Sequence, residues 1–168
     1  CNNYHRLPDF FTRIEKILIY FKDPIKQTFS NTELFNIFKK DKRTLLFLVH
    51  EKIILIDKSI YQIMLDTKNA KMQFYYFFYP EIKDALSEET VYFSIEEDFE
   101  SKRKIGQNDS YICELIRNDS VKEFIQYVNK NNYSLLSTIE RSFFETNYFL
   151  IKNRPTLIEY AAFFGSIQ

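Results

Sequence analysis

The sequence predicts an all-α protein built from helical hairpins. Apolar residues recur at three- and four-residue steps, capping signals precede several of these stretches, and the 168 residues include only two glycines and four prolines. Proteins made of many short strands need many tight turns, which glycine and proline supply, so a sheet protein is disfavoured. A hydrophobic share of 45% is enough to form a buried core.

The first helix is expected to begin near Asp9 and to end before Pro24. Its apolar face is formed by Phe10, Phe11, Ile14, Ile17, Leu18 and Phe21. Ser30 and Glu33 form a capping box, in which each side chain accepts a hydrogen bond from the backbone of the other residue. This box predicts a second helix over about residues 31–40, buried through Leu34, Phe35, Ile37 and Phe38.

The charged stretch Lys39–Arg43 is expected to be a solvated turn; the alternative is a contact for a phosphate or an acidic protein surface. The apolar residues of 45–49 then predict a helix that returns antiparallel to the preceding one. The run Ile53–Ile56 fits either a helix or a strand. Asp57 is expected to cap the next helix, which is carried by Ile60, Ile63 and Met64.

The middle of the chain gives weaker signals. Six consecutive aromatic residues at 74–79 have neither helical nor strand periodicity, whereas Pro80 suits the first position of a helix. Six acids between residues 87 and 100, followed by Lys102–Lys104, fit a solvated helix or, alternatively, an acidic docking strip. The polar stretch Gly106–Asp109 is the best candidate boundary, so residues 1–107 are expected to form an N-terminal helical domain.

Residues 108–168 are expected to form a degenerate hairpin, an insert and half of a further repeat. The hairpin spans 110–131, and the insert at 132–154 has room for an extra short helix. The residues expected to face inward in the hairpin are Ile112, Leu115, Ile116, Val121, Phe124, Ile125 and Val128.

The segment Thr156–Gln168 resembles the first helix and turn of an ankyrin repeat, whose pattern is T-P-L-H-x-A-A-x-x-G. Ala161 and Ala162 allow neighbouring helices to approach closely, and Gly165 permits a left-handed turn. Leu157 replaces the proline of the pattern, and Glu159 replaces the histidine that ties adjacent repeats. The segment 115–122 echoes 161–168 at an offset of 46 residues, against about 33 in an ankyrin unit.

Together with Thr32–Lys40 and Asp57–Ile60, this ending resembles the N-terminal regions of protist ankyrin-repeat proteins, in which an uncharacterised helical domain precedes the repeats. The resemblance covers about residues 30–168. It implies an all-α fold in which helical hairpins lead into an ankyrin-type solenoid. It also implies further repeats beyond Gln168 and no enzymatic activity.

The function expected from these observations is a non-enzymatic scaffold that recognises a protein partner of unknown identity. Phe163 and Phe164 follow the paired alanines, where ankyrin repeats place variable residues, and are the candidate partner-binding residues. The alternative for both rings is packing against the insert or the N-terminal domain. The rival functions are a structural subunit of a larger assembly and an enzyme with a dispersed site.

Other functions find little support in the sequence. The 23 basic and 23 acidic residues balance, so no nucleic-acid partner is expected, and no apolar run is long enough for a membrane span. No catalytic, cofactor-binding or metal-binding residues are predicted, because His5 and His50 lie far apart with no ligand cluster and there is no phosphate-binding loop. Cys113 is expected to be a buried hydrophobic residue, and a reducing, cytoplasmic location is expected.

Overall fold

The computed structural model describes residues 8–66, 71–85 and 94–166, and these residues form helices and no strand. The all-α prediction is therefore confirmed for the part of the chain that the structure describes. One isolated antiparallel bridge joins Thr138 to Thr156. The helices are α1 (Pro8–Tyr20), α2 (Lys22–Thr28), α3 (Asn31–Phe38), α4 (Lys42–His50), α5 (Lys58–Asp66), α6 (Lys71–Phe77), α7 (Tyr79–Ala85), α8 (Phe99–Ile105), α9 (Tyr111–Arg117), α10 (Val121–Lys130), α11 (Tyr148–Asn153) and α12 (Leu157–Phe164).

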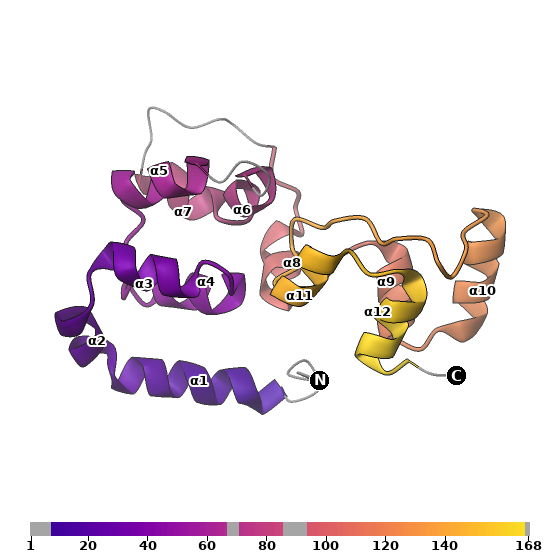
Figure 1. The fold of residues 1–168 in the computed structure, drawn as a ribbon, viewed down its shortest axis with the longest axis horizontal. Coiled ribbons are helices and arrows are strands. Elements are labelled where there is room, and N and C mark those ends of the chain that lie inside the picture. Colours follow the sequence, from indigo (N-terminus) through magenta and orange to yellow (C-terminus); the bar gives the residue numbers. More distant parts are fainter. Residues whose placement is uncertain (1–7, 67–70, 86–93, 167–168) are drawn as a thin grey trace.

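Helices α1 to α7 gather at one end of the molecule, while α9, α10 and α12 form the other end, with α8 and α11 between them (Figure 1). Each end has its own apolar core. The larger core joins α3 to α7 through residues such as Phe35, Leu48 and Phe77. The smaller core lies between α9, α11 and α12 and includes Cys113, Leu150 and Tyr160.

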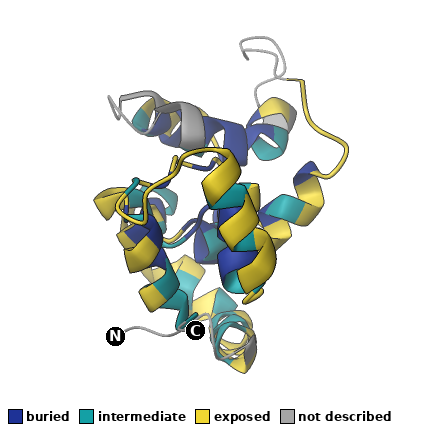
Figure 2. Ribbon diagram, turned by 90° about the vertical axis from the view of Figure 1, so that its right-hand side faces the viewer, coloured by how far each residue is buried: buried dark blue, intermediate teal, exposed yellow. Residues whose placement is uncertain are grey.

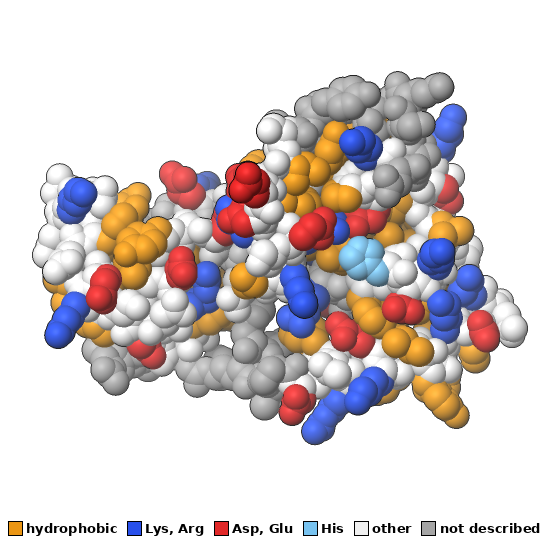
Figure 3. All heavy atoms as spheres, turned by 180° about the vertical axis from the view of Figure 1, so that it is seen from behind, with side chains coloured by type: hydrophobic (Ala, Val, Ile, Leu, Met, Phe, Trp, Pro, Cys, Tyr) orange, Lys and Arg blue, Asp and Glu red, His pale blue; other side chains and the backbone are white. Residues whose placement is uncertain are grey.

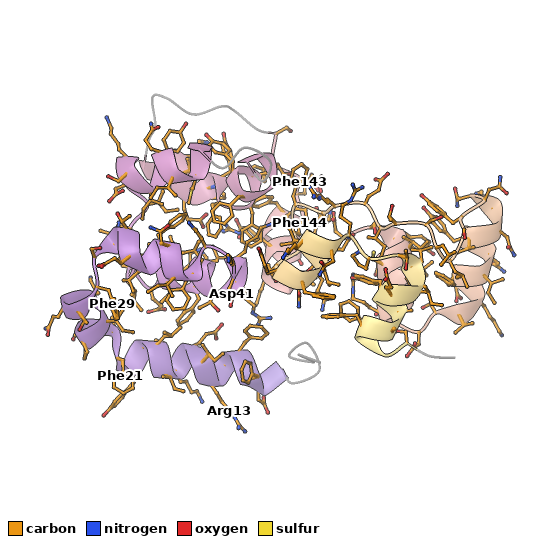
Figure 4. All side chains as sticks on the ribbon, viewed as in Figure 1. Arg13, Phe21, Phe29, Asp41, Phe143 and Phe144 are labelled. Atoms are coloured by element: carbon orange, nitrogen blue, oxygen red, sulfur yellow. The ribbon has the colours of Figure 1, made fainter. Side chains whose placement is uncertain are left out.

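The N-terminal helices lie near the predicted positions, with one addition, but Ile37 of α3, which was expected to be buried, is 56% exposed. Helix α1 ends before Pro24 as predicted, but a second short helix, α2, contains this proline. Pro24 is the third residue of α2, where the backbone N–H would have no partner within the helix, so its missing hydrogen atom costs nothing there. Phe21 and Phe29 flank α2 and are exposed at this end of the molecule (Figure 4).

Two of the predicted caps are present. Ser30 and Glu33 form both hydrogen bonds of the capping box that begins α3. The Asp57 carboxylate accepts a hydrogen bond of 2.9 Å from the backbone of Ile60 at the start of α5. Asp41 caps α4 in the same way through Thr44, so α4 begins inside the charged stretch that was expected to be a turn. Ile53–Ile56 form a connection between α4 and α5 without strand structure.

The aromatic run at 74–79 lies in α6 and at the start of α7. All its members except Phe74 are buried. Because both faces of this segment meet other elements, the run shows no periodicity. Helix α7 begins at Tyr79, so Pro80 lies one position later than predicted, still within the first turn. Of the acidic stretch at 87–100, residues 87–93 lie outside the described residues, and 94–98 are not helical.

The predicted hairpin of residues 110–131 is formed by α9 and α10, and the predicted extra helix of the insert is α11. Val121 and Ile125 were expected to face inward, but they are 37% and 53% exposed. Seen from this end of the molecule, the nearest helix is exposed or half-buried along its length (Figure 2). Helix α10 has no fully buried residue, because its partner α9 covers only one of its faces.

The turns that end α9 and α12 have the same hydrogen bonds. After α9, the N–H of Ser120 donates to Leu115 and that of Asp119 donates to Ile116, at 3.0 and 3.2 Å. After α12, Ser166 and Gly165 donate to Ala161 and Ala162 at the same two distances. Asp119 and Gly165 both have a left-handed backbone, with φ of 51° and 70°. This is the Schellman arrangement, which also ends α4 at Lys52 and α10 at Asn132. The turns after α9 and α12 lie at the predicted offset of 46 residues.

No helix in the described ranges has the length and apolar character needed to cross a lipid bilayer.

Candidate functional site

Residues 142–147 form an extended segment that touches both ends of the molecule, and we call this segment the strap. Its two phenylalanines lie at the junction between the ends (Figure 4). The Phe144 ring packs against Phe99 of α8 at 5.5 Å and Tyr76 of α6 at 6.0 Å, while Phe143 packs against Tyr76 at 4.8 Å. The insert was predicted to belong to residues 108–168, and its strap also packs against the N-terminal helices.

Lys42 of α4 anchors the strap. Its ammonium donates hydrogen bonds to the backbone carbonyls of Phe143 and Glu145, at 3.0 and 3.1 Å, and lies 5.1 Å from the centre of the Phe77 ring. Burial lowers the pKa of Lys42 to about 8, an effect that the nearby Glu145 carboxylate partly offsets. The prediction that Lys39–Arg43 is a solvated turn is therefore wrong for Lys42, which is buried because the strap covers it.

Glu145 is the buried acid of the strap. Its carboxylate accepts hydrogen bonds from the backbone N–H groups of Asn108 and Asn147, at 3.1 and 2.8 Å. Burial raises the pKa of Glu145, while these two donors and Lys42 act in the opposite direction. The carboxylate fixes the strap to the segment before α9, so its role in the structure is to connect elements.

Gly106 and Thr146 make a further close contact. Gly106 ends α8 with a left-handed φ of 67°, and its carbonyl accepts hydrogen bonds from both the N–H and the hydroxyl of Thr146. A Cβ atom at position 106 would lie 3.0 Å from the Thr146 side chain. The strap therefore requires glycine here for both its backbone conformation and its lack of a side chain.

Arg103 of α8 is also buried, although it belongs to a stretch predicted to be solvated. It forms ion pairs with Glu81 of α7 at 2.7 Å and Glu100 at 2.9 Å, and donates to the carbonyl of Phe77. The Nε2 atom of His50 lies 3.0 Å from the Glu81 carboxylate, both oxygens of which also accept from Arg103. On the face shown in Figure 3, acidic and basic side chains are interspersed, and no large area carries a single sign of charge.

Cys113 lies in the smaller core, as predicted, and is fully buried. Burial raises the pKa of its thiol, so the thiol stays protonated at neutral pH. The neighbouring Tyr160 hydroxyl accepts a hydrogen bond of 2.7 Å from Arg117, and burial raises the pKa of this phenol as well. These groups have the properties of a packed core and not of an activated nucleophile.

A small cleft lies between the strap, α11 and the turn before α12. The side chain amide of Asn108 at this cleft donates to the carbonyl of Glu140, and the Ser142 hydroxyl donates to Asp109 at 2.6 Å. These polar groups are therefore already hydrogen-bonded within the protein. In the described ranges, no group of three or more His, Cys, Asp or Glu side chains is placed to bind a metal ion.

The candidate partner-binding residues Phe163 and Phe164 are half-buried at the end of α12. Phe164 packs against Tyr160 at 4.7 Å, and Phe163 packs against Phe164 at 5.1 Å. Phe163 also stacks on Phe149 of α11 at 6.1 Å, with an angle of 10° between the rings. Phe149 belongs to the insert, so Phe163 has the contact that the alternative prediction described, and part of its ring is still accessible. Partner binding by either phenylalanine stays a prediction.

The structure places further exposed residues near Phe163 that were not predicted from the sequence. Phe149 is 58% exposed, and the neighbouring Tyr148 is exposed as well, with the ammonium of Lys40 lying 5.4 Å from the centre of its ring. Lys152 is exposed one turn further along α11. Figure 1 shows α11 between α4 and α12, which explains how residues so far apart in sequence meet. The only sequence signal was the predicted extra helix in the insert.

Comparison of the chain with protein-family models, with curated proteins and with solved structures finds no match.

Proposed function

We propose that this chain is a non-enzymatic protein-interaction module in which helical hairpins of the ankyrin type stack side by side. The observation that carries the proposal is the direct packing of α12 on α9, in which the turns that end these helices, 46 residues apart, are joined by a hydrogen bond. A repeated supersecondary unit that packs on its neighbour is the signature of a solenoid.

Contacts between α9 and α12 support the stacking of two units. The two helices pack against each other, and the Ser166 hydroxyl after α12 donates a hydrogen bond to the carbonyl of Ile116 in α9. The turns of the two units are thus joined directly. Glu159, which replaces the histidine of the ankyrin pattern, forms a capping box with Thr156 and stabilises the start of α12 locally.

Recognition of a protein partner is the function that such a surface serves best. Stacked helices hold their exposed side chains in fixed positions, so little conformational entropy is lost when a partner binds. Half-buried aromatic rings such as Phe163 and Phe164 are the type of residue that contributes most to interface energies.

The test is affinity capture from cells that express the protein, with the full chain compared with a double variant, Phe163→Ser and Phe164→Ser. We expect the double variant to lose captured partners while its melting temperature stays close to that of the unchanged chain. A matched control replaces Tyr20 and Phe21, exposed aromatic residues of the N-terminal end, with serine. Failure of the double variant to fold would mean that both rings belong to the core, and the binding role of these rings would have to be abandoned.

A further inference from the structure

A mixed aromatic and basic surface covers α11 and the end of α12. It consists of Lys40, Tyr148, Phe149, Lys152 and Phe163, and we call it the α11 surface. All five side chains are exposed except Phe163, which is half-buried. The surface combines residues from the α3–α4 connection, the insert and the last helix, so it exists only in the folded chain.

We propose that the α11 surface binds an acidic peptide segment that carries an aromatic or aliphatic side chain. This inference rests on the proposed function and names the chemistry of the partner. The apolar side chain of the segment would pack on Phe149 and Phe163, while its carboxylates would pair with Lys40 and Lys152.

The aromatic rings of the surface are supported by a buried ring of the smaller core. The rings of Phe149, Phe163, Phe164 and Tyr160 follow one another at centroid distances of 6.1, 5.1 and 4.7 Å, and the last ring is fully buried. Phe149 is thus the exposed end of an ordered row that begins in the core. Rigid aromatic side chains contribute contact area at a small cost in entropy, which is the property of an interface anchor.

The charge on the surface fits an acidic partner. The described residues show no ion pair for Lys40 or Lys152. The acids nearest in sequence are engaged elsewhere: Asp41 accepts from Thr44 at the start of α4, and Glu159 accepts from Thr156 at the start of α12. Glu145 is buried in the strap. Helix α11 itself carries no acid. The α11 surface therefore carries two ammonium groups that form no ion pair with a described carboxylate.

A single-stranded nucleic acid also stacks on aromatic rings, but the surface suits it less well. Proteins that bind single-stranded nucleic acid by stacking also present a positively charged groove that follows the phosphate backbone. The chain has as many acidic as basic residues, and the α11 surface offers only two lysines. Nucleic-acid binding would be detected in the test below as competition by a thymidine decamer.

The experiment is a selection of random dodecapeptides displayed on phage against the immobilised full chain, followed by fluorescence polarisation with the enriched peptides. We expect enriched peptides to contain several acids around one aromatic or aliphatic residue. Phe149→Ser should weaken their binding at least about tenfold, as expected for loss of an interface anchor. The double variant Lys40→Glu and Lys152→Glu should weaken it about as much, and added salt should weaken binding to the unchanged chain.

Matched controls separate the α11 surface from general stickiness. Leu136→Ser removes a side chain that is 72% exposed on another loop, and Lys130→Glu reverses an exposed charge on α10, so neither should change the affinity. Enriched peptides without acids, or binding unchanged by Phe149→Ser, would overturn the inference, as would an absence of enriched peptides or competition by a thymidine decamer. Protein partners captured equally well by the Phe149→Ser and unchanged chains would reject this surface but leave the proposed function standing.

Discussion

Lys42 shows how much a single side chain depends on distant parts of the chain. Its ammonium is held by backbone carbonyls of the strap, about a hundred positions later in the sequence. A buried charge is costly unless hydrogen bonds replace its contacts with water. Two carbonyls and the nearby Glu145 carboxylate offset this cost only in part, because burial still lowers the pKa of Lys42. Removal of the ammonium would in turn leave the two strap carbonyls without this donor.

We predict that Lys42→Met destabilises the protein by about 2–4 kcal/mol at pH 7, because two buried carbonyls lose a donor. The loss should grow as pH rises from about 8 toward 10. Burial lowers the pKa of Lys42 to about 8 in the folded state, whereas the unfolded chain titrates near its ordinary value of about 10.4. Between these values the unfolded state binds more protons, so the free energy of unfolding of the unchanged chain rises with pH from about 8 to about 10.4, and this increment is absent from Lys42→Met.

Urea unfolding of the two chains at several pH values measures this difference. Titration of Cys113, Tyr76 and Tyr160, whose pKa values are raised by burial, occurs in both chains and cancels in the comparison. Lys16→Met, at an exposed position of α1, is the control: it keeps Lys42, so its free energy of unfolding should vary with pH as that of the unchanged chain does. A difference between unchanged and Lys42→Met chains that stays constant from pH 7 to 10 would contradict the burial of the ammonium.

The sequence could not have identified Lys42 as the buried member of its cluster. Lys39, Lys40 and Lys42 are chemically alike and close together, and only the arrival of the strap distinguishes Lys42. Arg103 likewise could not be identified as buried from the sequence. It is buried because its guanidinium pairs with the carboxylate of Glu81, on another helix, at 2.7 Å. Burial of a long charged side chain is decided by its partners in the fold, which a single sequence does not reveal.

At the scale of elements, helix ends were the most predictable features. Capping at Ser30 and Asp57 depends on residues only three positions apart, so it is visible in the sequence. The left-handed turn at Gly165 was predictable for the same reason, because glycine favours that conformation. The helices that contain the aromatic run at 74–79 were not predictable, because their burial depends on contacts with several other elements.

We predict that Gly106→Ala destabilises the protein by about 2–3 kcal/mol. The left-handed backbone costs an alanine about 1 kcal/mol, and the new Cβ, 3.0 Å from Thr146, forces the strap to shift. Chemical denaturation measures the loss. If Gly106→Ala lowered the free energy of unfolding by less than about 0.5 kcal/mol, Thr146 of the strap would not be held against Gly106 in solution.

The opposite change at another left-handed position should stabilise the protein. Asp119 has a φ of 51° in the turn between α9 and α10, and only its backbone takes part in the hydrogen bonds of the turn. Asp119→Gly should raise the free energy of unfolding by about 0.5 kcal/mol, because relief of the left-handed strain exceeds the entropy cost of glycine. A decrease in urea unfolding experiments would mean that the turn does not have the Schellman geometry that it shares with Gly165.

At the scale of the whole molecule, the two cores depend on a narrow junction. The core of α3–α7 and that of α9–α12 are joined mainly by the aromatic cluster of Tyr76, Phe99 and Phe144 and by the hydrogen bonds of the strap. The predicted domain boundary at residue 107 falls beside this junction, but the strap returns across it. This return could not be predicted, because residues 132–154 were recognised only as an insert of unknown path.

We predict that the unchanged chain unfolds in a single calorimetric transition and that Phe144→Ala separates this transition into two. The fully buried Phe144 ring contacts α6 and α8 at once, so its removal should cost about 3–5 kcal/mol, nearly all of it at the junction and little within either core. The two cores would then melt independently, which calorimetry detects as two peaks. Leu48→Ala, a truncation inside the larger core, is the control, because it should lower the stability without removing the strap contacts. Two peaks in the unchanged chain would show that the strap does not couple the two ends. One peak in Phe144→Ala at a lower temperature would show that the coupling does not depend on this ring.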